Sequence, residues 1–179
     1  ELLKDTTAFL NLIQNIQQPE DIKHLITIDV TSLYTNIPHE EGAEWVSNFF
    51  AETMPLWLPN NKQLKPISKT TIKTLMLFIL QNNVFEFNNK FYKQLIGTTM
   101  GADFSVNYAN IYMHKFFKAF NIKYKYSFPS NFGRFIDDMF FTNNQDLQYI
   151  NQYLSDLNKF HNTIKFTHEI SSTSVHFLD

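Results

Sequence analysis

The sequence predicts an α+β fold in which helices pack on one face of an antiparallel sheet. Short apolar runs typical of strands and longer runs with helical periodicity follow one another in the order strand, helices, hairpin, helix, hairpin, helix and strand. The chain has 179 residues, of which 44% are hydrophobic and 16% aromatic, and it is long enough to bury a core. No repeat or low-complexity tract divides it, so we expect a single domain over residues 1–179.

In the first half of the chain, capping residues and prolines mark where elements begin and end. Asp5 is a capping residue followed by apolar side chains at helical spacing, and His24 to Val30 is rich in β-branched residues. Pro38 suits the start of a helix, and the prolines that follow Thr53 indicate a loop. The predicted elements are a helix over 5–17, a strand over 24–30, a helix from Pro38 to about Thr53, a loop over 54–67 and a helix from Ser68 or Thr70 to about Gln81.

The second half of the chain contains two predicted hairpins and two longer helices. Aromatic residues alternate around Asn88-Asn89, a pair that tolerates the positive φ of a tight turn. A long helix with an apolar stripe follows the loop that ends at Gly101. The predicted elements are a hairpin over 84–94, a helix to about Phe120, a hairpin over 132–142, a helix from Asn144 to about Phe160, and strands near 163–169 and 174–178.

Composition excludes several classes of site. The formal net charge of −2 lacks the basic excess of an autonomous nucleic-acid-binding domain. Cysteine is absent, which excludes disulfides and cysteine-based zinc sites. The six histidines are scattered and lack the spacing of a helical zinc motif. No apolar run approaches the roughly 20 residues of a membrane span, and there is no signal-peptide pattern, so we expect no membrane partner.

Two acidic stretches interrupt runs that otherwise resemble buried strands, one at Asp29 and one at Asp137-Asp138. A buried carboxylate is costly unless it is paired or binds a cation, and adjacent carboxylates repel each other unless a divalent cation relieves the repulsion. Carboxylates suit Mg²⁺, and two carboxylate strands that meet in space can hold two ions about 3.5–4 Å apart for phosphoryl transfer. We therefore predict a metal site formed by Asp29, the Val30 carbonyl, Asp137 and Asp138.

Both acidic stretches also have a simpler interpretation. A lone Asp at the end of a strand commonly caps the next turn, and Asp is a good turn former in hairpins. If the three carboxylates were only turn formers, the chain would be a non-enzymatic interaction or structural fragment. The strongly apolar residues on either side of Asp137-Asp138 favour the metal site instead.

Two motifs around these carboxylates resemble motifs A and C of the reverse transcriptase palm. In the first, Asp29 is followed five positions later by an aromatic residue, Tyr34. The second is an aromatic-x-Asp-Asp box that ends in Asp137-Asp138, in which Phe135 replaces the usual Tyr and so lacks only a hydroxyl.

The segment between these motifs resembles motif B of the same enzymes, whose pattern is Gln-Gly-x-x-x-Ser-Pro-x-x-x-Asn. Gly101, Ser105 and Asn110 match it at the right spacing, whereas Met100 and Val106 depart from Gln and Pro. The order of the three motifs along the chain is also that of a reverse transcriptase.

Finer details resemble the reverse transcriptases of Penelope-like elements. Residues 29–42, 94–101 and 109–113 are similar to this family's motifs, and residues 134–141 resemble its Arg-Tyr-Ile-Asp-Asp box. Residues 164–169 and 177–179 resemble its last two motifs. The resemblance covers about residues 5–179 and implies a partial reverse transcriptase domain. We expect the palm with part of the fingers, without the thumb or the endonuclease that many members carry.

The resemblance implies a role for each matched residue. Asp29 and Asp137 would hold two Mg²⁺ ions, with Mn²⁺ as the alternative ion, and Asp138 would be a third, weaker carboxylate ligand. Tyr34 would stack under the incoming sugar and exclude a ribose 2′-hydroxyl. The nucleotide-binding residues would be Tyr34, Gly101, Ser105, Asn110 and Lys165, with Lys165 protonating the leaving pyrophosphate. A capping Ser, a surface Asn and a strand-edge Lys remain open as alternatives for the last three.

The implied activity is that of a retrotransposon's RNA-directed DNA polymerase, a nucleotidyltransferase that extends a DNA primer along an RNA template from dNTPs in the nucleus. The aromatic content also suggests self-association of a chain without its thumb. One alternative is a catalytically inactive, domesticated palm that binds nucleic acid or protein, although the three intact carboxylates speak against it. Another is a different two-metal palm enzyme such as a nucleotide cyclase, against which Tyr34 and the motif B residues stand.

Overall fold

The computed structural model describes residues 2–17, 21–61, 63–127 and 129–178. They form two compact units, one made of residues 1–31 and 118–179 and the other of residues 32–117. Helix α5 (Ser105–Tyr124) contributes residues to both units. Among the described helices, none is both long and apolar enough to cross a membrane.

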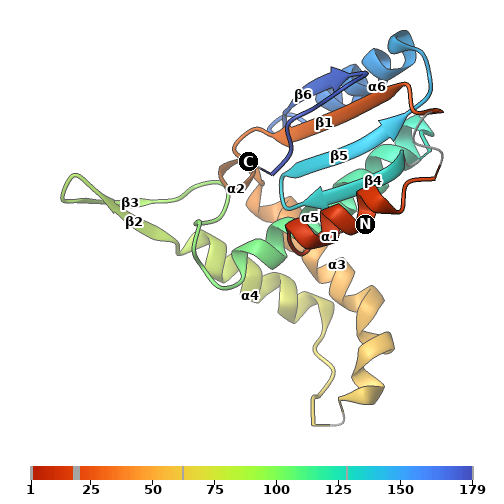
Figure 1. The fold of residues 1–179 in the computed structure, drawn as a ribbon. Helices are drawn as coiled ribbons and strands as arrows, with labels where there is room; N and C mark the ends of the chain where they lie inside the picture. Colours follow the sequence, from red (N-terminus) through yellow and green to blue (C-terminus); the bar gives the residue numbers. More distant parts are fainter. Residues whose placement is uncertain (1, 18–20, 62, 128, 179) are drawn as a thin grey trace. The chain divides into compact units, whose positions relative to one another are not determined.

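The first unit is built on a four-stranded antiparallel sheet (Figure 1). The strand order is β4-β5-β1-β6, so β1 lies between two neighbours. Three consecutive residues of β1, Ile26 to Ile28, are buried, which means that both faces of the strand are covered there. The strands are β1 (His24–Val30), β4 (Ser130–Phe135), β5 (Asp138–Asn143) and β6 (Phe166–Ser171). The predicted antiparallel α+β fold is confirmed.

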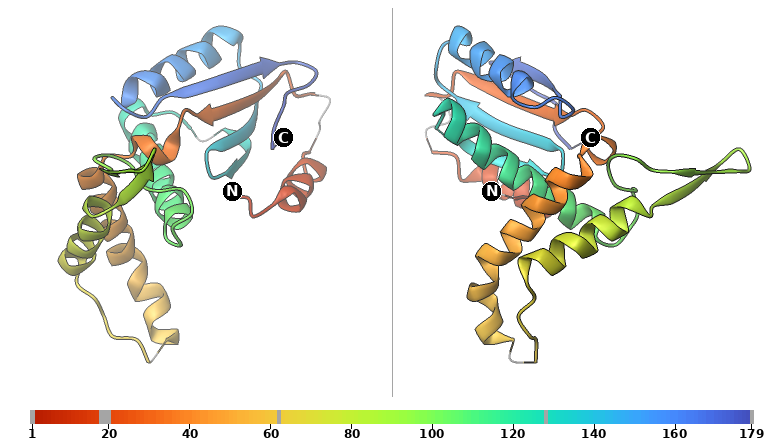
Figure 2. Two further views of the ribbon diagram at one scale, coloured as in Figure 1. Left: turned by 90° about the vertical axis from the view of Figure 1, so that its left-hand side faces the viewer. Right: turned by 180° about the vertical axis from the view of Figure 1, so that it is seen from behind.

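Helix α6 (Leu147–Phe160) lies along one face of this sheet (Figure 2). The ring centroids of Phe141 in β5 and Tyr153 in α6 are 6.1 Å apart. Its neighbour Phe140 points to the opposite face, where Phe9 of α1 (Thr6–Gln14) lies with its ring centroid 5.3 Å away. Phe177 completes that second aromatic cluster. The sheet thus carries α6 on one face and α1 on the other, whereas the sequence predicted helices on one face.

The second unit combines helices with a two-stranded hairpin. Helix α3 (His39–Trp57) packs against α4 (Lys69–Gln81), and Glu44 of α3 pairs with Lys69 and Lys73 of α4 at 2.6 Å and 2.9 Å. Its elements are α2 (Leu33–Asn36), α3 (His39–Trp57), η2 (Leu58–Asn60), α4 (Lys69–Gln81), β2 (Val84–Phe87), β3 (Lys90–Lys93) and the first part of α5.

Local sequence signals located several of these elements correctly. The Asp5 side chain accepts a hydrogen bond from the Ala8 N–H at 2.8 Å, and Ser68 accepts one from Thr71 at 3.0 Å, so both predicted caps form. Asn88 and Asn89 have φ values of 52° and 56°, the left-handed conformation that a two-residue hairpin turn requires.

Three sequence-based expectations were wrong. Helix α3 continues through Pro55 to Trp57, although Pro55 lacks the N–H for one backbone hydrogen bond of the helix. Asp146 caps α6 in place of Asn144, whose side chain instead accepts a hydrogen bond from the Lys23 N–H at 3.1 Å. Described residues 174–178 form no strand, and the apolar Phe177 packs against the sheet.

Candidate active site

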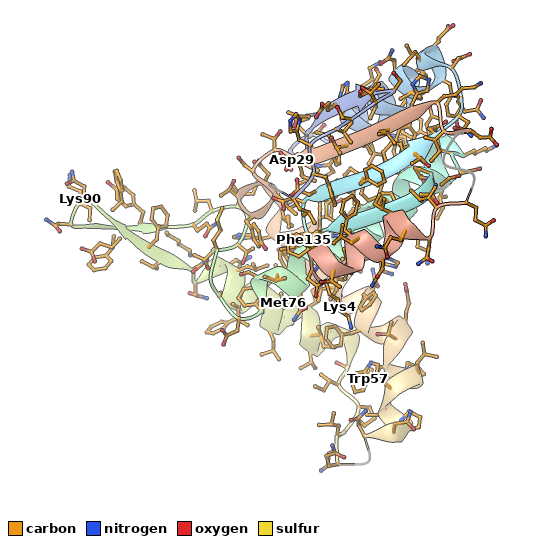
Figure 3. The ribbon with its side chains drawn as sticks, viewed as in Figure 1. Lys4, Asp29, Trp57, Met76, Lys90 and Phe135 are labelled. Atoms are coloured by element: carbon orange, nitrogen blue, oxygen red, sulfur yellow. The ribbon has the colours of Figure 1, made fainter. Side chains whose placement is uncertain are left out.

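The strand register brings the predicted carboxylates to one end of the sheet. Ile28 of β1 pairs with Met139 of β5, and continuing this register by one pair aligns Asp29 with Asp138. The next alignment is marked by a hydrogen bond, because the Val30 N–H donates to the Asp137 carbonyl oxygen at 3.3 Å. Asp29 and Phe135, which lie at the ends of β1 and β4, are labelled at this end of the sheet in Figure 3.

Asp137 lies in a tight turn between β4 and β5. Phe135 pairs with Asp138, which leaves only Ile136 and Asp137 between the two strands. Ile136 has a φ of 52°, a left-handed conformation that a β-branched residue rarely adopts and that costs on the order of 1–3 kcal/mol. The Arg134 Nη1 atom donates to the Ile136 carbonyl oxygen at 2.7 Å and so stabilises this conformation.

Burial and the charge of Asp137 shift the pKa values of Asp29 and Arg134. Partial desolvation and, second, the negative charge of Asp137 raise the pKa of Asp29, while the Val30 N–H opposes the shift. Burial lowers the pKa of the Arg134 guanidinium to about 10, and the nearby Asp137 carboxylate opposes that change. Arg134 is therefore still a cation at neutral pH, and Asp29 and Asp137 are near enough to repel each other.

The carboxylates are more accessible than the sequence suggested. Asp29 is exposed, and Asp137 and Asp138 are half-buried, although the neighbouring strand residues Ile28 and Met139 are buried. The reason is their position at the end of the strands. Asp29 and Asp138 also share the sheet face of Phe140, opposite α6, because side chains alternate along each strand. A cation or a phosphate can therefore reach them from solvent.

Lys165, predicted as a proton donor, has local partners in this structure. Its ammonium donates to the carbonyl oxygens of Asn158 and His161, each at 2.7 Å, at the C-terminal end of α6. Its own carbonyl accepts from the Thr31 N–H at 2.9 Å. This arrangement is typical of a lysine that caps a helix, and the role of Lys165 toward pyrophosphate stays a prediction.

In the second unit, the segment that carries Tyr34 is bonded to the loop before α5. The Tyr34 carbonyl accepts from the Thr98 N–H at 2.6 Å, and the Ile37 carbonyl accepts from the Gly97 N–H at 2.9 Å. Gly97 has a φ of 80°, and a Cβ placed on it would lie 2.3 Å from the Tyr34 carbonyl oxygen. Only glycine fits this close approach.

The predicted motif B residues differ in their surroundings. The Ser105 hydroxyl is buried and donates to the Thr99 carbonyl oxygen at 2.7 Å, which favours a structural role for it. Gly101 has a φ of 93°, and a Cβ on it would meet no atom within 4 Å. Asn110 lies half-buried in α5. Tyr34, Gly101, Ser105 and Asn110 all belong to the second unit, whereas the three aspartates and Lys165 belong to the first.

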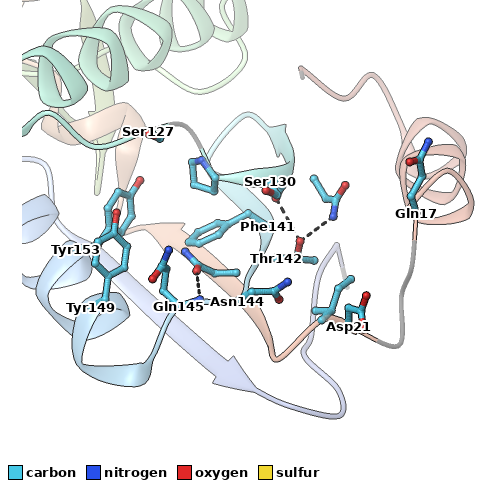
Figure 4. Close-up of a pocket in the computed structure, with 14 residues that line it drawn as sticks. Gln17, Asp21, Ser127, Ser130, Phe141, Thr142, Asn144, Gln145, Tyr149 and Tyr153 are labelled. Carbon is cyan, nitrogen blue, oxygen red and sulfur yellow. Dashed lines mark hydrogen bonds between the residues drawn. The ribbon is translucent and has the colours of Figure 1, made fainter.

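A polar pocket of about 460 Å³ lies at the opposite end of β5, away from the carboxylates (Figure 4). Its wall includes Phe141, Tyr153 and the hydrogen-bonded pair Asn131 and Thr142, whose side chains are 2.8 Å apart. Because Asp138 begins β5 and this pocket lies beside the residues that end it, the pocket is separate from the candidate site.

Comparison with known protein families identifies the family of this chain. Residues 3–175 match the family model described as reverse transcriptase (RNA-dependent DNA polymerase). The chain belongs to the reverse transcriptase family. The resemblance of its motifs to the Penelope-like branch comes from the sequence alone, and a comparison with curated proteins gave no match.

A solved structure shares the fold of this reverse transcriptase domain. It is the apo telomerase of Candida tropicalis truncated from its C-terminal domain, with a TM-score of 0.65 and 15% sequence identity. The superposition covers 99% of this chain and 38% of the telomerase chain. At this level of identity the likeness concerns the fold alone.

The donor atoms of the reverse transcriptase domain fit a divalent cation only in part. Asp29 and Asp137 supply two neighbouring carboxylates whose mutual repulsion a cation would relieve. Among the described residues, however, no group of three or more His, Cys, Asp or Glu side chains is arranged to hold a metal ion. The structure therefore places Asp29 and Asp137 near each other, and the role of all three aspartates as metal ligands stays a prediction.

Sequence reasoning missed two residues that shape the site. Arg134 appeared only as part of a family motif, although a charged residue in an apolar strand is itself a signal that it has partners. Gly97 was assigned to a loop, and no local pattern reveals that it lies against the backbone of Tyr34.

Proposed function

We propose that this chain is the RNA-directed DNA polymerase of a Penelope-like retroelement and extends a DNA primer along an RNA template from dNTPs. The observation that carries the proposal is the nearness of the Asp29 and Asp137 carboxylates at an accessible end of the sheet, where partial desolvation and the charge of Asp137 raise the pKa of Asp29. The family match and the ordered motifs A, B and C support the same activity.

The carboxylates act in this proposal as ligands for two divalent ions. Bound Mg²⁺, or Mn²⁺ in its place, would activate the primer 3′-hydroxyl and neutralise the triphosphate. Asp29 and Asp137 would orient these ions, with the Val30 carbonyl and Asp138 as further ligands. Arg134 is a cation near neutral pH and offsets part of the negative charge of Asp137.

The residues of the second unit would select the nucleotide. Tyr34 would present its ring to the sugar of the incoming dNTP, and its backbone is held by the Gly97–Thr98 segment. Gly101 is open to its surroundings and leaves room for a base or template strand to approach the backbone. Ser105 and Asn110 would act from α5, Ser105 chiefly by fixing the preceding loop. As a retroelement enzyme the protein would act in the nucleus.

Primer extension tests the proposal directly. Incorporation of a labelled dNTP on an RNA-template/DNA-primer duplex is compared between wild type, Asp137→Asn and Asp21→Asn, with EDTA as the metal-free arm. Asp21 is an exposed aspartate beside the polar pocket and serves as the matched control. We expect metal-dependent incorporation by wild type and Asp21→Asn, and a loss of about 100-fold or more in Asp137→Asn. A folded wild-type protein without incorporation would favour a catalytically inactive, nucleic-acid-binding palm.

A further inference from the structure

Arg134 is the single arginine of the chain, and it is almost entirely buried. It lies in β4 opposite Met139 of β5, and only 6% of its surface is exposed. A charged side chain is rarely buried so fully unless it has partners that offset its desolvation. One of them is the Ile136 carbonyl oxygen, to which Nη1 donates at 2.7 Å, and another is the nearby charge of Asp137.

The carbonyl that Arg134 holds belongs to the peptide group that enters Asp137. The peptide group that leaves Asp137 is held as well, because its carbonyl oxygen accepts from the Val30 N–H at 3.3 Å. Both peptides that flank the carboxylate-bearing residue are therefore anchored, one by Arg134 and the other by β1. No side chain of the turn itself supplies either bond.

The turn needs such an anchor because its conformation is unfavourable for its sequence. Ile136 adopts a φ of 52°, where a β-branched side chain crowds the backbone. The two strands leave only Ile136 and Asp137 to make the turn. Without the hydrogen bond from Arg134, Ile136 would relieve its backbone strain by moving to a negative φ. That change would rotate the peptide group between Ile136 and Asp137.

We propose that Arg134 is a positioning residue that holds the strained Ile136–Asp137 turn and thereby fixes the Asp137 carboxylate for a divalent cation beside Asp29. This inference rests on the proposed function, because it takes the carboxylates to be metal ligands. It adds a residue that touches neither metal nor substrate and acts through the backbone of the turn.

A positioning role and a purely electrostatic role of Arg134 predict opposite changes in cation affinity when its charge is removed. A positive charge close to Asp137 repels an incoming cation, so its removal alone would tighten cation binding. Loss of the anchor would instead let the carboxylate move and weaken binding. Outer partners of metal ligands typically change affinity by about 10–100-fold when they are removed.

The test measures Mn²⁺ affinity from the electron paramagnetic resonance signal of unbound Mn²⁺, without nucleotide or nucleic acid. The variants are Arg134→Met, Arg134→Lys, Asp137→Asn and the double variant Arg134→Met with Ile136→Gly, each checked for folding by circular dichroism. Glycine adopts the observed φ without steric cost. We expect Mn²⁺ affinity about tenfold weaker in Arg134→Met and partial recovery in the double variant.

The outcomes separate this inference from the proposed function. Mn²⁺ binding in Arg134→Met that equals or exceeds wild type, while Asp137→Asn binds weakly, would overturn the role of Arg134 alone. Equal, weak binding by wild type and Asp137→Asn would overturn the metal site and the inference together. If Arg134→Met does not fold, Arg134→Lys decides, because it keeps the charge but not the planar donor fork. Weaker Mn²⁺ binding by Arg134→Lys then supports the positioning role of Arg134, and Mn²⁺ binding as tight as in wild type overturns it.

Discussion

The Val30 N–H donates to the carbonyl oxygen of Asp137 at 3.3 Å, and this bond joins the two segments that carry the candidate catalytic carboxylates. It extends the β1–β5 ladder beyond its last regular pair, Ile28 and Met139. Two stretches that are far apart in the sequence are thus fixed together by backbone geometry. The position of the carboxylates therefore depends on the sheet, and their chemistry can be altered without disturbing it.

Asp29→Asn should stabilise the metal-free protein at neutral pH. The pKa of Asp29 is raised in the folded state above its ordinary value of 3.8, so the folded protein holds this proton more tightly than the unfolded chain. Ionisation of Asp29 therefore begins to cost stability as the pH rises above 3.8, and the full cost is present above the folded-state pKa.

Urea unfolding of wild type and Asp29→Asn, in EDTA, checks this prediction. The variant should be more stable at pH 7, and the difference should vanish as the pH falls below the unfolded-state value of 3.8. A variant that is less stable than wild type at pH 7 would show that the ionised Asp29 carboxylate does not destabilise the folded protein.

Gly97→Ala and Gly101→Ala should destabilise the protein to different extents. Both glycines have positive φ, which costs an alanine about 1–2 kcal/mol. Only at Gly97 would the new Cβ also overlap backbone atoms, those of Tyr34 and Thr35 at 2.3 Å and 2.6 Å. We expect Gly101→Ala to lose about 1–2 kcal/mol of unfolding free energy and Gly97→Ala clearly more, as measured by urea unfolding. Equal losses would contradict the observed approach of Gly97 to Tyr34.

Two buried tyrosines of α5 should respond in opposite directions to removal of their hydroxyl groups. In the described structure, the Tyr108 hydroxyl is buried and has no hydrogen-bond partner, whereas the Tyr112 hydroxyl donates to Glu41 at 3.0 Å. Tyr108→Phe should therefore raise the unfolding free energy by about 1 kcal/mol, and Tyr112→Phe should lower it by about 1–3 kcal/mol. Thermal or urea unfolding measures both, and a loss of stability in Tyr108→Phe would reveal a partner for its hydroxyl.

Lys165→Met separates two roles for this lysine. If Lys165 only caps α6, the variant should lose about 0.3–1 kcal/mol of unfolding free energy, with little change in the rate of primer extension. If Lys165 donates a proton to pyrophosphate, the substitution should instead lower the maximal rate of primer extension by about 100-fold or more. Measuring both quantities on the same preparation distinguishes them, and we expect the first result from the observed contacts.

The parts of the fold that were predictable from the sequence are those set by local signals. The β-branched run His24–Val30 coincides with β1, and Asn88-Asn89 makes the expected hairpin turn. The end of α3 was missed because Pro55 does not end the helix, as a proline in a helix interior usually does. The contact of Gly97 with Tyr34 joins residues far apart in the chain, and no local pattern encodes it.

The candidate site was predictable in its residue types but not in its arrangement. The motifs indicated which carboxylates to examine, and the structure places Asp29 near enough to Asp137 for their charges to interact. The sequence suggested buried carboxylates because their flanking residues are apolar, yet these side chains lie at or next to the ends of the strands, where solvent reaches them. The internal partners of Ser105 and Lys165 likewise depend on loops and helix ends that only the folded chain brings near.

The central claim is that Asp29 and Asp137 share one site, and a ¹³C NMR titration of the Asp29 carboxyl tests it most directly. In wild type the pKa of Asp29 should lie above 3.8, and in Asp137→Asn it should fall because the neighbouring charge is gone, while partial desolvation remains. Mg²⁺ should lower it in wild type and leave it unchanged in Asp137→Asn. An Asp29 pKa that is the same in both proteins and insensitive to Mg²⁺ would contradict the shared site.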